Sequence, residues 1–176
     1  MERDVESILV SEEEIKQICK QLGEQITRDY EGKNLLVVSV LKGAVVFMGD
    51  LLREIKCHCL IDFLSVSSYS GTKTTGVVKF KKDLDIDPDG MDILIVEDIL
   101  DSGVTLSYLS GVLAGRNANS IKICTLLDKP ANRRADIKAD YVGKVIPDEF
   151  VIGYGLDYDE KYRNPILTAD HTPLEW

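Results

Sequence analysis

The stretch that decides the fold spans residues 93–106 and reads ILIVEDILDSGVTL. Its first four residues form an uninterrupted apolar run of strand length, which leads into three carboxylates, a Ser-Gly turn and a segment of helical composition at 104–116. A short, continuously apolar run is typical of a strand that is buried on both faces. The stretch therefore predicts a strand, a turn and a helix that belong to a parallel sheet.

The chain on either side of this stretch alternates segments of the same two kinds. Strands are expected at 35–40, 57–66, 77–80, 121–127 and 142–146, with a further short one at 150–152, and helices after the capping-box pattern of Ser11 and Glu14 and at 44–55. Strands buried on both faces and separated by helices imply an α/β fold, in which a mostly parallel sheet is flanked by helices. Ligands of such sheets bind beyond the carboxyl ends of the strands, so a site is expected there.

The composition is that of a soluble globular protein. The chain has 176 residues, of which 44% are hydrophobic and 29% are charged, and these values exclude disorder, collagen-like repeats and a coiled coil as descriptions of the whole chain. Neither an internal repeat nor a linker is visible, so residues 1–176 are expected to form a single domain. The 21 Lys and Arg against 30 Asp and Glu give a net charge of −9, which argues against a dedicated nucleic-acid binder.

Terminal sequence and cysteine usage favour a cytoplasmic protein. The N-terminus lacks the basic start and apolar segment of a signal peptide, and the most apolar stretch, 35–48, is interrupted by Lys42 and is too short for a membrane span. Cys57, His58 and Cys59 suggest a zinc site, but in a strand the two cysteines would face away from His58, and no second cysteine pair follows at zinc-site spacing. Reduced cysteines in a core strand are therefore favoured over zinc.

The turn after the apolar run has the chemistry of a phosphate cradle. Gly103 permits a tight turn with exposed backbone N–H groups, and Ser102 and Thr105 add hydroxyl donors at a helix N-terminus, whose dipole favours an anion. Carboxylates beside a phosphate would repel it unless they accept hydrogen bonds from sugar hydroxyls, directly or through a divalent cation. A phosphate with vicinal hydroxyls nearby is the outline of a ribose 5-phosphate. From these residues alone, a helix capped by Asp101 or Ser102 with two solvated acids is an equally good interpretation.

Residues 96–105 resemble the phosphoribosyl-pyrophosphate motif of the type I phosphoribosyltransferases, in which an apolar strand is followed by two acids and the pattern D-[ST]-G-x-T. One branch of that family, the hypoxanthine-guanine phosphoribosyltransferases, is similar over nearly the whole chain. The segments that carry this second resemblance are 41–43, 68–69, 128–129, 150–154, 156–158 and 162–163. The combination of Lys129 with the segment 150–163 makes it far more specific than the motif alone.

The resemblance implies a fold, a reaction and a cofactor. The fold is the type I phosphoribosyltransferase sheet with a small hood built from terminal segments. The reaction transfers a 5-phosphoribosyl group from phosphoribosyl pyrophosphate to N9 of a 6-oxopurine, hypoxanthine or guanine, and yields IMP or GMP and pyrophosphate in purine salvage. Mg²⁺ is the implied cofactor and a homodimer or homotetramer the implied assembly, with neither nucleic acid nor a membrane as partner.

Carried over residue by residue, the resemblance assigns the sugar, the phosphates and the metal. The residues implied for the ribose 5-phosphate are Glu97, Asp98, Asp101, Ser102, Gly103, Val104 and Thr105, with Val104 contributing mainly its backbone. Those implied for pyrophosphate are Lys42, Gly43, Ser68, Tyr69 and Arg163, and those implied for Mg²⁺ are Glu97, Asp98 and Asp157. The resemblance also implies a cis peptide bond before Lys42 and suggests a lid at 67–76 that shields the reaction from water.

The same resemblance assigns the purine pocket and the catalytic groups. The residues implied for the purine are Ile99, Lys129, Phe150, Val151, Leu156 and Asp157. The catalytic set is Asp101, which takes the proton from N7 as N9 attacks, Lys129, which donates to O6, and Arg163, which neutralises pyrophosphate. Considered singly and without the resemblance, Phe150 is better explained as a core aromatic, Asp157 as a turn residue and Arg163 as a surface charge.

Two other protein classes share parts of this pattern. A phosphoacceptor signalling domain also has an acidic pair after a strand and a Lys-Pro after a later one, but its acidic pair follows the first strand, and Glu97 and Asp98 come too late. A phosphoribosyltransferase-like regulator binds RNA or DNA with the same fold, and the net charge of −9 and the intact base-pocket residues argue against it. Full turnover without nucleic-acid binding at low salt separates enzyme from regulator.

Overall fold

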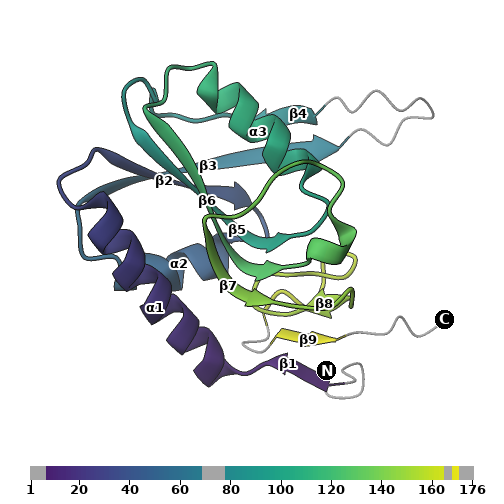
Figure 1. Ribbon diagram of the computed structural model, residues 1–176. Helices are drawn as coiled ribbons and strands as arrows, with labels where there is room; N and C mark the ends of the chain where they lie inside the picture. The colour runs from purple at the N-terminus through teal and green to yellow at the C-terminus, as the bar shows by residue number, and fades with distance from the viewer. Residues whose placement is uncertain (1–6, 69–77, 165–167, 171–176) are drawn as a thin grey trace.

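The computed structural model describes residues 7–68, 78–164 and 168–170, and its centre is a six-stranded sheet (Figure 1). The strands lie in the order β4-β3-β2-β5-β6-β7. Their bounds are β2 (Leu35–Leu41), β3 (Cys59–Ser68), β4 (Val78–Lys82), β5 (Asp92–Leu100), β6 (Ser120–Asp128) and β7 (Tyr141–Val145). Every neighbouring pair is parallel except β3 with β4, so the predicted mostly parallel sheet is confirmed.

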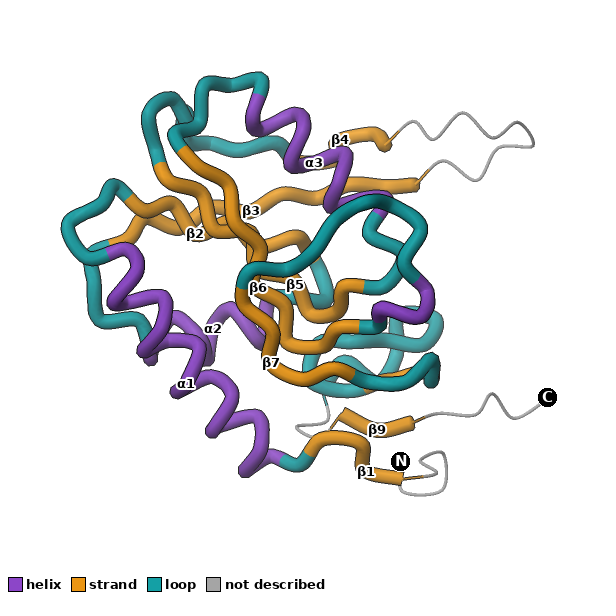
Figure 2. Tube along the Cα trace, viewed as in Figure 1, coloured by secondary structure: helices purple, strands orange, loops and turns teal. Residues whose placement is uncertain are grey.

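Helices cover both faces of this sheet (Figure 2). The helices α1 (Glu12–Tyr30) and α2 (Val45–Glu54) share one core with Leu94 and Val96 of β5, and α3 (Val104–Ala114) shares the other core with Ile93 and Ile95. Successive residues of β5 therefore enter opposite cores, which explains why its apolar run has no break. No helix in the described part of the chain has the length and apolarity to cross a membrane.

The first helix begins with the predicted capping box. The Ser11 hydroxyl accepts a hydrogen bond from the Glu14 backbone N–H at 3.2 Å, and the Glu14 carboxylate accepts one from the Ser11 N–H at 2.9 Å. The apolar face of α1 consists of Ile15, Ile18, Cys19, Leu22 and Ile26, and all of these are buried except Ile18, which is half-buried. The capping box fixes where α1 starts, and the apolar face fixes which side of the helix packs on α2 and the sheet.

A second, three-stranded sheet joins the two ends of the described chain in the order β1-β9-β8. It consists of β1 (Ser7–Val10), β8 (Val151–Ile152) and β9 (Thr168–Asp170), all paired antiparallel. Lys144 of β7 donates to the Leu9 carbonyl at 3.1 Å, so this sheet lies beside the β7 edge of the main sheet, as Figure 1 shows. It is the small hood of the expected fold. β1 and β9 were not predictable from the sequence, because such short strands hardly display a period of two.

The structure corrects the end of the central strand. The sequence prediction ended the strand at Val96 and placed Glu97 and Asp98 after it, whereas β5 continues to Leu100. Ile99 and Leu100 keep their pairing with β6, and Leu100 is buried, so the two acids interrupt the apolar pattern without ending the strand. Both acids therefore stand on sheet backbone, which positions them more rigidly than a loop would.

The structure also corrects the segment around Cys57. The strand predicted from Cys57 begins instead at Cys59, because the neighbouring β2 starts at Leu35, which pairs with Cys59, and offers no partner further back. Cys57 and Cys59 therefore do not share a strand. All four cysteines are free thiols. The described residues contain no group of three or more His, Cys, Asp or Glu side chains placed to hold a metal.

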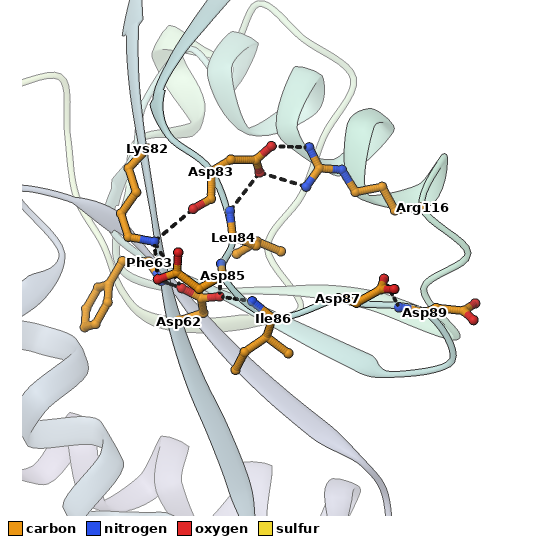
Figure 3. A network of polar contacts seen from close by, with 10 residues as sticks. All are labelled: Asp62, Phe63, Lys82, Asp83, Leu84, Asp85, Ile86, Asp87, Asp89 and Arg116. Carbon is orange, nitrogen blue, oxygen red and sulfur yellow. Dashed lines mark hydrogen bonds and ion pairs between the residues drawn. The ribbon is translucent and has the colours of Figure 1, made fainter.

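One buried carboxylate, Asp62 of β3, holds the loop that follows β4 (Figure 3). Its side chain is 4% exposed, and Lys82 Nζ lies 3.4 Å from Oδ1. Three backbone N–H groups donate to it at 2.7–2.9 Å, those of Phe63, Asp85 and Ile86. Burial alone would raise the pKa of Asp62, but the backbone hydrogen bonds outweigh burial and hold the pKa below its usual value.

We expect Asp62→Ala to lower the free energy of unfolding by about 2–4 kcal/mol, because buried N–H groups lose their acceptor. Folding depresses the pKa, so the stabilisation from Asp62 is complete above the unfolded pKa of about 4 and is lost as the pH falls through the folded value. Urea unfolding at pH 7 and pH 3 measures both effects. Exposed Asp89→Ala is the control and should change stability by less than about 0.5 kcal/mol. Equal losses in the two variants would contradict the role of Asp62.

Candidate active site

The carboxyl ends of β2 and β5 meet in a very close contact. Gly43, in the turn between β2 and α2, lies against the Asp98 carboxylate, and a Cβ placed on Gly43 would lie 1.8 Å from Asp98 Oδ2. The peptide bond between Leu41 and Lys42 is cis, as the resemblance implies. Only glycine fits at position 43 while the carboxylate stays where it is.

The segment after β8 folds over this turn. Gly155 has a φ of +101°, and a Cβ placed on it would lie 2.0 Å from the Gly43 carbonyl oxygen. Arg163 fastens the segment, because its guanidinium donates to the Gly155 carbonyl at 2.8 Å and pairs with Asp157 at 2.9 Å, while Gly155 N–H donates to the Arg163 carbonyl at 2.9 Å. Gly43, Asp98 and the segment 155–163, which come from three distant parts of the sequence, thus form one group.

We expect Gly155→Ala to lower the free energy of unfolding by about 1–3 kcal/mol, because alanine is strained at this φ and its Cβ would overlap the Gly43 carbonyl. Gly49→Ala in α2 is the matched control, since nothing lies within 4 Å of the added Cβ. A helix prefers alanine to glycine, so the control should gain about 0.5–1 kcal/mol. Urea unfolding followed by circular dichroism measures both, and equal stability of the two variants would refute the packing of Gly155 on Gly43.

Lys42 and Arg163 share a counterion, Glu160. Lys42 Nζ lies 2.8 Å and Arg163 Nη2 3.3 Å from Glu160 Oε2, and the hydrogen bond from Lys42 lowers the pKa of Glu160. Lys42 and Glu160 are both 65% exposed, so water competes for this ion pair and it is weak. A carboxylate between two cations marks a place that suits an anionic group of a ligand. Glu160 was not predictable as a site residue, because a glutamate in an acidic turn has no distinctive local pattern.

The N-terminus of α3 frames a small cavity. Gly103, with a φ of +77°, precedes the helix, and a Cβ on it would lie 2.5 Å from Ile137 Cγ2. The Ser102 carbonyl accepts hydrogen bonds from the N–H groups of Arg134 and Ala135 at 2.9 and 3.1 Å, which fixes the turn. The cavity has a volume of about 120 Å³ and is lined by Ile99, Leu100, Asp101, Ser102, Gly103, Thr105 and Leu106. The N–H of Val104 donates to Ser102 Oγ at 3.5 Å, and the N–H groups of a first helical turn beside such a cavity favour an anion.

Asp101 lines this cavity with an unsatisfied oxygen. Its Oδ1 is buried and accepts no hydrogen bond from the described residues. Its backbone carbonyl is held by the Arg133 guanidinium at 2.6 Å, and Arg133 is in turn paired with Asp128. A buried oxygen without a donor is unfavourable unless a ligand supplies one, so Asp101 is suited to accept a hydrogen bond or a proton from a bound molecule.

Glu97 and Asp98 are adjacent acids at the carboxyl end of β5. Burial, together with the charge of Asp98, raises the pKa of Glu97 well above its usual range. Burial also raises the pKa of Asp98, although the Ile99 N–H donates to it at 2.8 Å and the charge of Arg163 acts in the opposite direction. A half-buried and a buried acid that resist ionising together are stabilised by hydroxyl donors or by a cation.

Lys129 and Phe150 have the exposure expected of a ring-binding site. Lys129, the residue after β6, is 7% exposed, and its ammonium pairs with Asp148 at 3.0 Å. Phe150, two residues after Asp148, is 44% exposed and meets the Tyr158 ring edge-on, with centroids 5.8 Å apart. Phe150 is therefore not a core aromatic, so that alternative is wrong. A part-exposed aromatic ring and a polar anchor are typical of a pocket for a flat polar ligand.

The remaining predicted residues are placed as follows. Val151 and Leu156 are buried, Ile99 and Thr105 are half-buried, and Val104 is exposed at the start of α3. Ser68 is the last residue of β3, while Tyr69 and most of the predicted lid at 67–76 lie outside the described residues. Arg163 is half-buried and ion-paired rather than a plain surface charge, and Asp157 both accepts from the Glu160 N–H at 2.9 Å and pairs with Arg163.

Comparison with known proteins identifies the class. Residues 6–159 match the model of the phosphoribosyl transferase domain, and the chain belongs to that family. It is 54% identical over 165 residues to a hypoxanthine-guanine phosphoribosyltransferase of Staphylococcus aureus, covering 93% of this chain and 92% of that protein. Its fold is similar to a crystal structure of a hypoxanthine phosphoribosyltransferase from Staphylococcus aureus, with a TM-score of 0.95, 52% identity and coverage of 98% and 95% of the two chains. It is also similar to a crystal structure of a hypoxanthine-guanine phosphoribosyltransferase from Bacillus anthracis, with a TM-score of 0.91 and 47% identity. That comparison covers 96% of this chain and 99% of the other.

Proposed function

We propose that the protein transfers the 5-phosphoribosyl group of phosphoribosyl pyrophosphate to N9 of hypoxanthine and guanine, forming IMP or GMP and pyrophosphate in purine salvage. Family membership and the 54% identity to a hypoxanthine-guanine phosphoribosyltransferase support this reaction. The geometric observation that carries the proposal is the cavity at the start of α3. Helix N–H groups and the unsatisfied oxygen of Asp101 border the same small space, which suits a phosphate and a proton acceptor side by side.

The sugar and its phosphate are assigned to the end of β5 and the turn after it. The residues of this subsite are Glu97, Asp98, Asp101, Ser102, Gly103, Val104 and Thr105. The turn supplies N–H and hydroxyl donors for the 5-phosphate. Burial and the charge of Asp98 raise the pKa of Glu97. This supports a role for Glu97 and Asp98 as acceptors of ribose hydroxyls, whose hydrogen bonds would offset the repulsion between the two carboxylates.

Glu97 and Asp98 also fit Mg²⁺. Both are hard oxygen ligands with poorly compensated charge, and Mg²⁺ is usually held by one or two carboxylates together with substrate phosphates. Asp157 would supply a second position, and there it would have to share its carboxylate with Arg163. Since the described residues hold no cluster of three metal ligands, substrate oxygens would complete the coordination. The bound metal would neutralise the leaving group.

Pyrophosphate is assigned to the cations that now share Glu160. Lys42 and Arg163 would bind its oxygens, and the turn at Gly43 would let its backbone approach closely. Ser68 and Tyr69 complete this assignment, and Tyr69 lies outside the described residues. Because Glu160 is exposed and weakly held, a more highly charged anion can replace it at both cations.

The chemistry follows from these placements. As the bond from the sugar to pyrophosphate breaks, positive charge develops on the ribose, and the nearby acids stabilise it. Asp101 accepts the N7 proton while N9 attacks. Phe150 stacks on the purine, and Lys129 donates to O6. Ile99, Val151, Leu156 and Asp157 form the rest of the purine subsite.

A steady-state assay tests the proposal. The protein is incubated with phosphoribosyl pyrophosphate and Mg²⁺ and with hypoxanthine, guanine, xanthine or adenine in turn, and nucleotides are separated by chromatography. We expect IMP from hypoxanthine and GMP from guanine. The absence of nucleotide from both bases would overturn the proposed function.

We further propose a single-domain, cytoplasmic protein that assembles as a homodimer or homotetramer. The four free cysteines, two of which are buried, support a reducing compartment. The assembly rests on the resemblance to the family. Sedimentation velocity distinguishes monomer, dimer and tetramer.

A further inference from the structure

Lys129 is a buried cation whose ion-pair partner in the described residues is Asp148. The ammonium lies 3.0 Å from Asp148 Oδ1, and the Lys129 side chain is 9% exposed. The Lys129 N–H donates to the Leu100 carbonyl at 3.0 Å, which anchors the backbone of this residue to the end of β5. A lysine ammonium has three donors, and a buried one is stable only where they find acceptors. Asp148 therefore decides where one of these donors points.

Asp148 is itself held in place. Asn132 Nδ2 donates to Asp148 Oδ1 at 2.9 Å, so Asn132 and Lys129 meet the same oxygen. Asn132 ends the short helical turn that directly follows Lys129, and Asp148 lies between β7 and β8, two residues before Phe150. The pair thus ties the segment that carries the ammonium to the segment that carries the aromatic ring.

The Asp148 carboxylate is 55% exposed, whereas the ammonium that it pairs with is almost fully covered. Asp148 can therefore stay hydrated while it holds Lys129, and this exposed carboxylate avoids most of the desolvation cost of a buried ion pair. Removing Asp148 would leave the ammonium with one acceptor fewer and free to turn. A ligand carbonyl would then have to order that side chain on binding, which weakens its hydrogen bond.

We propose that Asp148 is a positioning residue that sets the preference for 6-oxopurines, by holding one donor of Lys129 so that the others face purine O6. This inference rests on the proposed function. A purine with an amino group at C6 has no acceptor there, so it gains nothing from an oriented ammonium. Asp148 should therefore help hypoxanthine and guanine without helping adenine.

The test compares the wild-type protein with Asp148→Ala, Asp148→Asn and the control Glu149→Gln, a neighbouring acid that forms no ion pair with Lys129 among the described residues. Steady-state kinetics give the KM for hypoxanthine, the KM for phosphoribosyl pyrophosphate, and kcat/KM for adenine. We expect Asp148→Ala to raise the KM for hypoxanthine about 10–100-fold, the scale of a hydrogen bond to a charged group. Asp148→Asn should give a smaller rise and Glu149→Gln none.

The KM for phosphoribosyl pyrophosphate and the kcat/KM for adenine should stay within about threefold of wild type, because neither depends on the oriented donor. A purely structural role would lower the use of both purines together, and that result would overturn the inference. So would an unchanged KM for hypoxanthine in Asp148→Ala and Asp148→Asn. The Asn variant keeps the shape of the side chain, which covers the case that the Ala variant does not fold. A wild-type protein that makes no IMP would instead overturn the proposed function itself.

Discussion

Replacing Asp101 with Asn is expected to slow turnover about 10²–10⁴-fold while the affinity for phosphoribosyl pyrophosphate hardly changes. The amide keeps the shape of the carboxylate, so the cradle at the start of α3 should stay intact. It cannot accept the N7 proton in the way that a carboxylate does. Oδ1 of Asp101 is buried and has no donor among the described residues. In the Asn variant this position holds an amide atom, which is a poor base.

Single-turnover rates measure the chemical step, and calorimetric titration measures binding of phosphoribosyl pyrophosphate. Asp136→Asn is the control, because Asp136 is an exposed aspartate in the loop that packs on this turn and should leave both quantities unchanged. A wild-type rate in Asp101→Asn would show that another group takes the proton. A large loss of binding with an unchanged rate would show that Asp101 shapes the cradle instead.

Adenine is expected to be a poorer substrate than hypoxanthine by at least about 10³-fold. The Lys129 ammonium has donors and no acceptor, and it lies in a nearly closed position. O6 of hypoxanthine accepts from it, whereas the adenine amino group places a donor against a donor and leaves the ammonium hydrogens that Asp148 does not hold without an acceptor. Measurement of kcat/KM for the two bases at saturating phosphoribosyl pyrophosphate gives the ratio.

Lys129→Gln should narrow that ratio mainly by weakening hypoxanthine, because an amide can accept as well as donate. Lys138→Gln, at an exposed lysine, is the control and should leave the ratio as it is. A wild-type preference for adenine would contradict the assignment of Lys129 to O6. So would a Lys129→Gln variant with the discrimination of wild type.

The main sheet was predictable because its strands and helices differ in local pattern. The run at 93–96 is apolar throughout since its residues enter two cores, and the capping box at Ser11 fixes the start of α1. The end of β5 was not predictable, because Glu97 and Asp98 interrupt the pattern while pairing with β6 carries the strand to Leu100. Local sequence records side-chain character, but it does not record which strand lies alongside.

The candidate site also has a part that local sequence predicts and a part that depends on long-range contacts. Gly103 and Ser102 lie in one short motif, so the turn before α3 was visible in the sequence. The contacts that complete the site are long-range. Glu160 pairs with Lys42 across 118 positions of sequence, and Asp148, between β7 and β8, pairs with Lys129. Neither acid lies in a sequence pattern that distinguishes it from an ordinary surface acid. Only the folded chain shows their partners.

The contacts of Gly43 with Asp98 and with Gly155 bear on how this protein can be re-engineered. A side chain at Gly43 would displace a carboxylate, and one at Gly155 would strike the Gly43 carbonyl, so selection in the laboratory should return glycine at both positions. The purine side is looser, since Asp148 and Phe150 are partly exposed. Changes that widen the range of accepted bases should therefore accumulate there, while the phosphate side stays fixed.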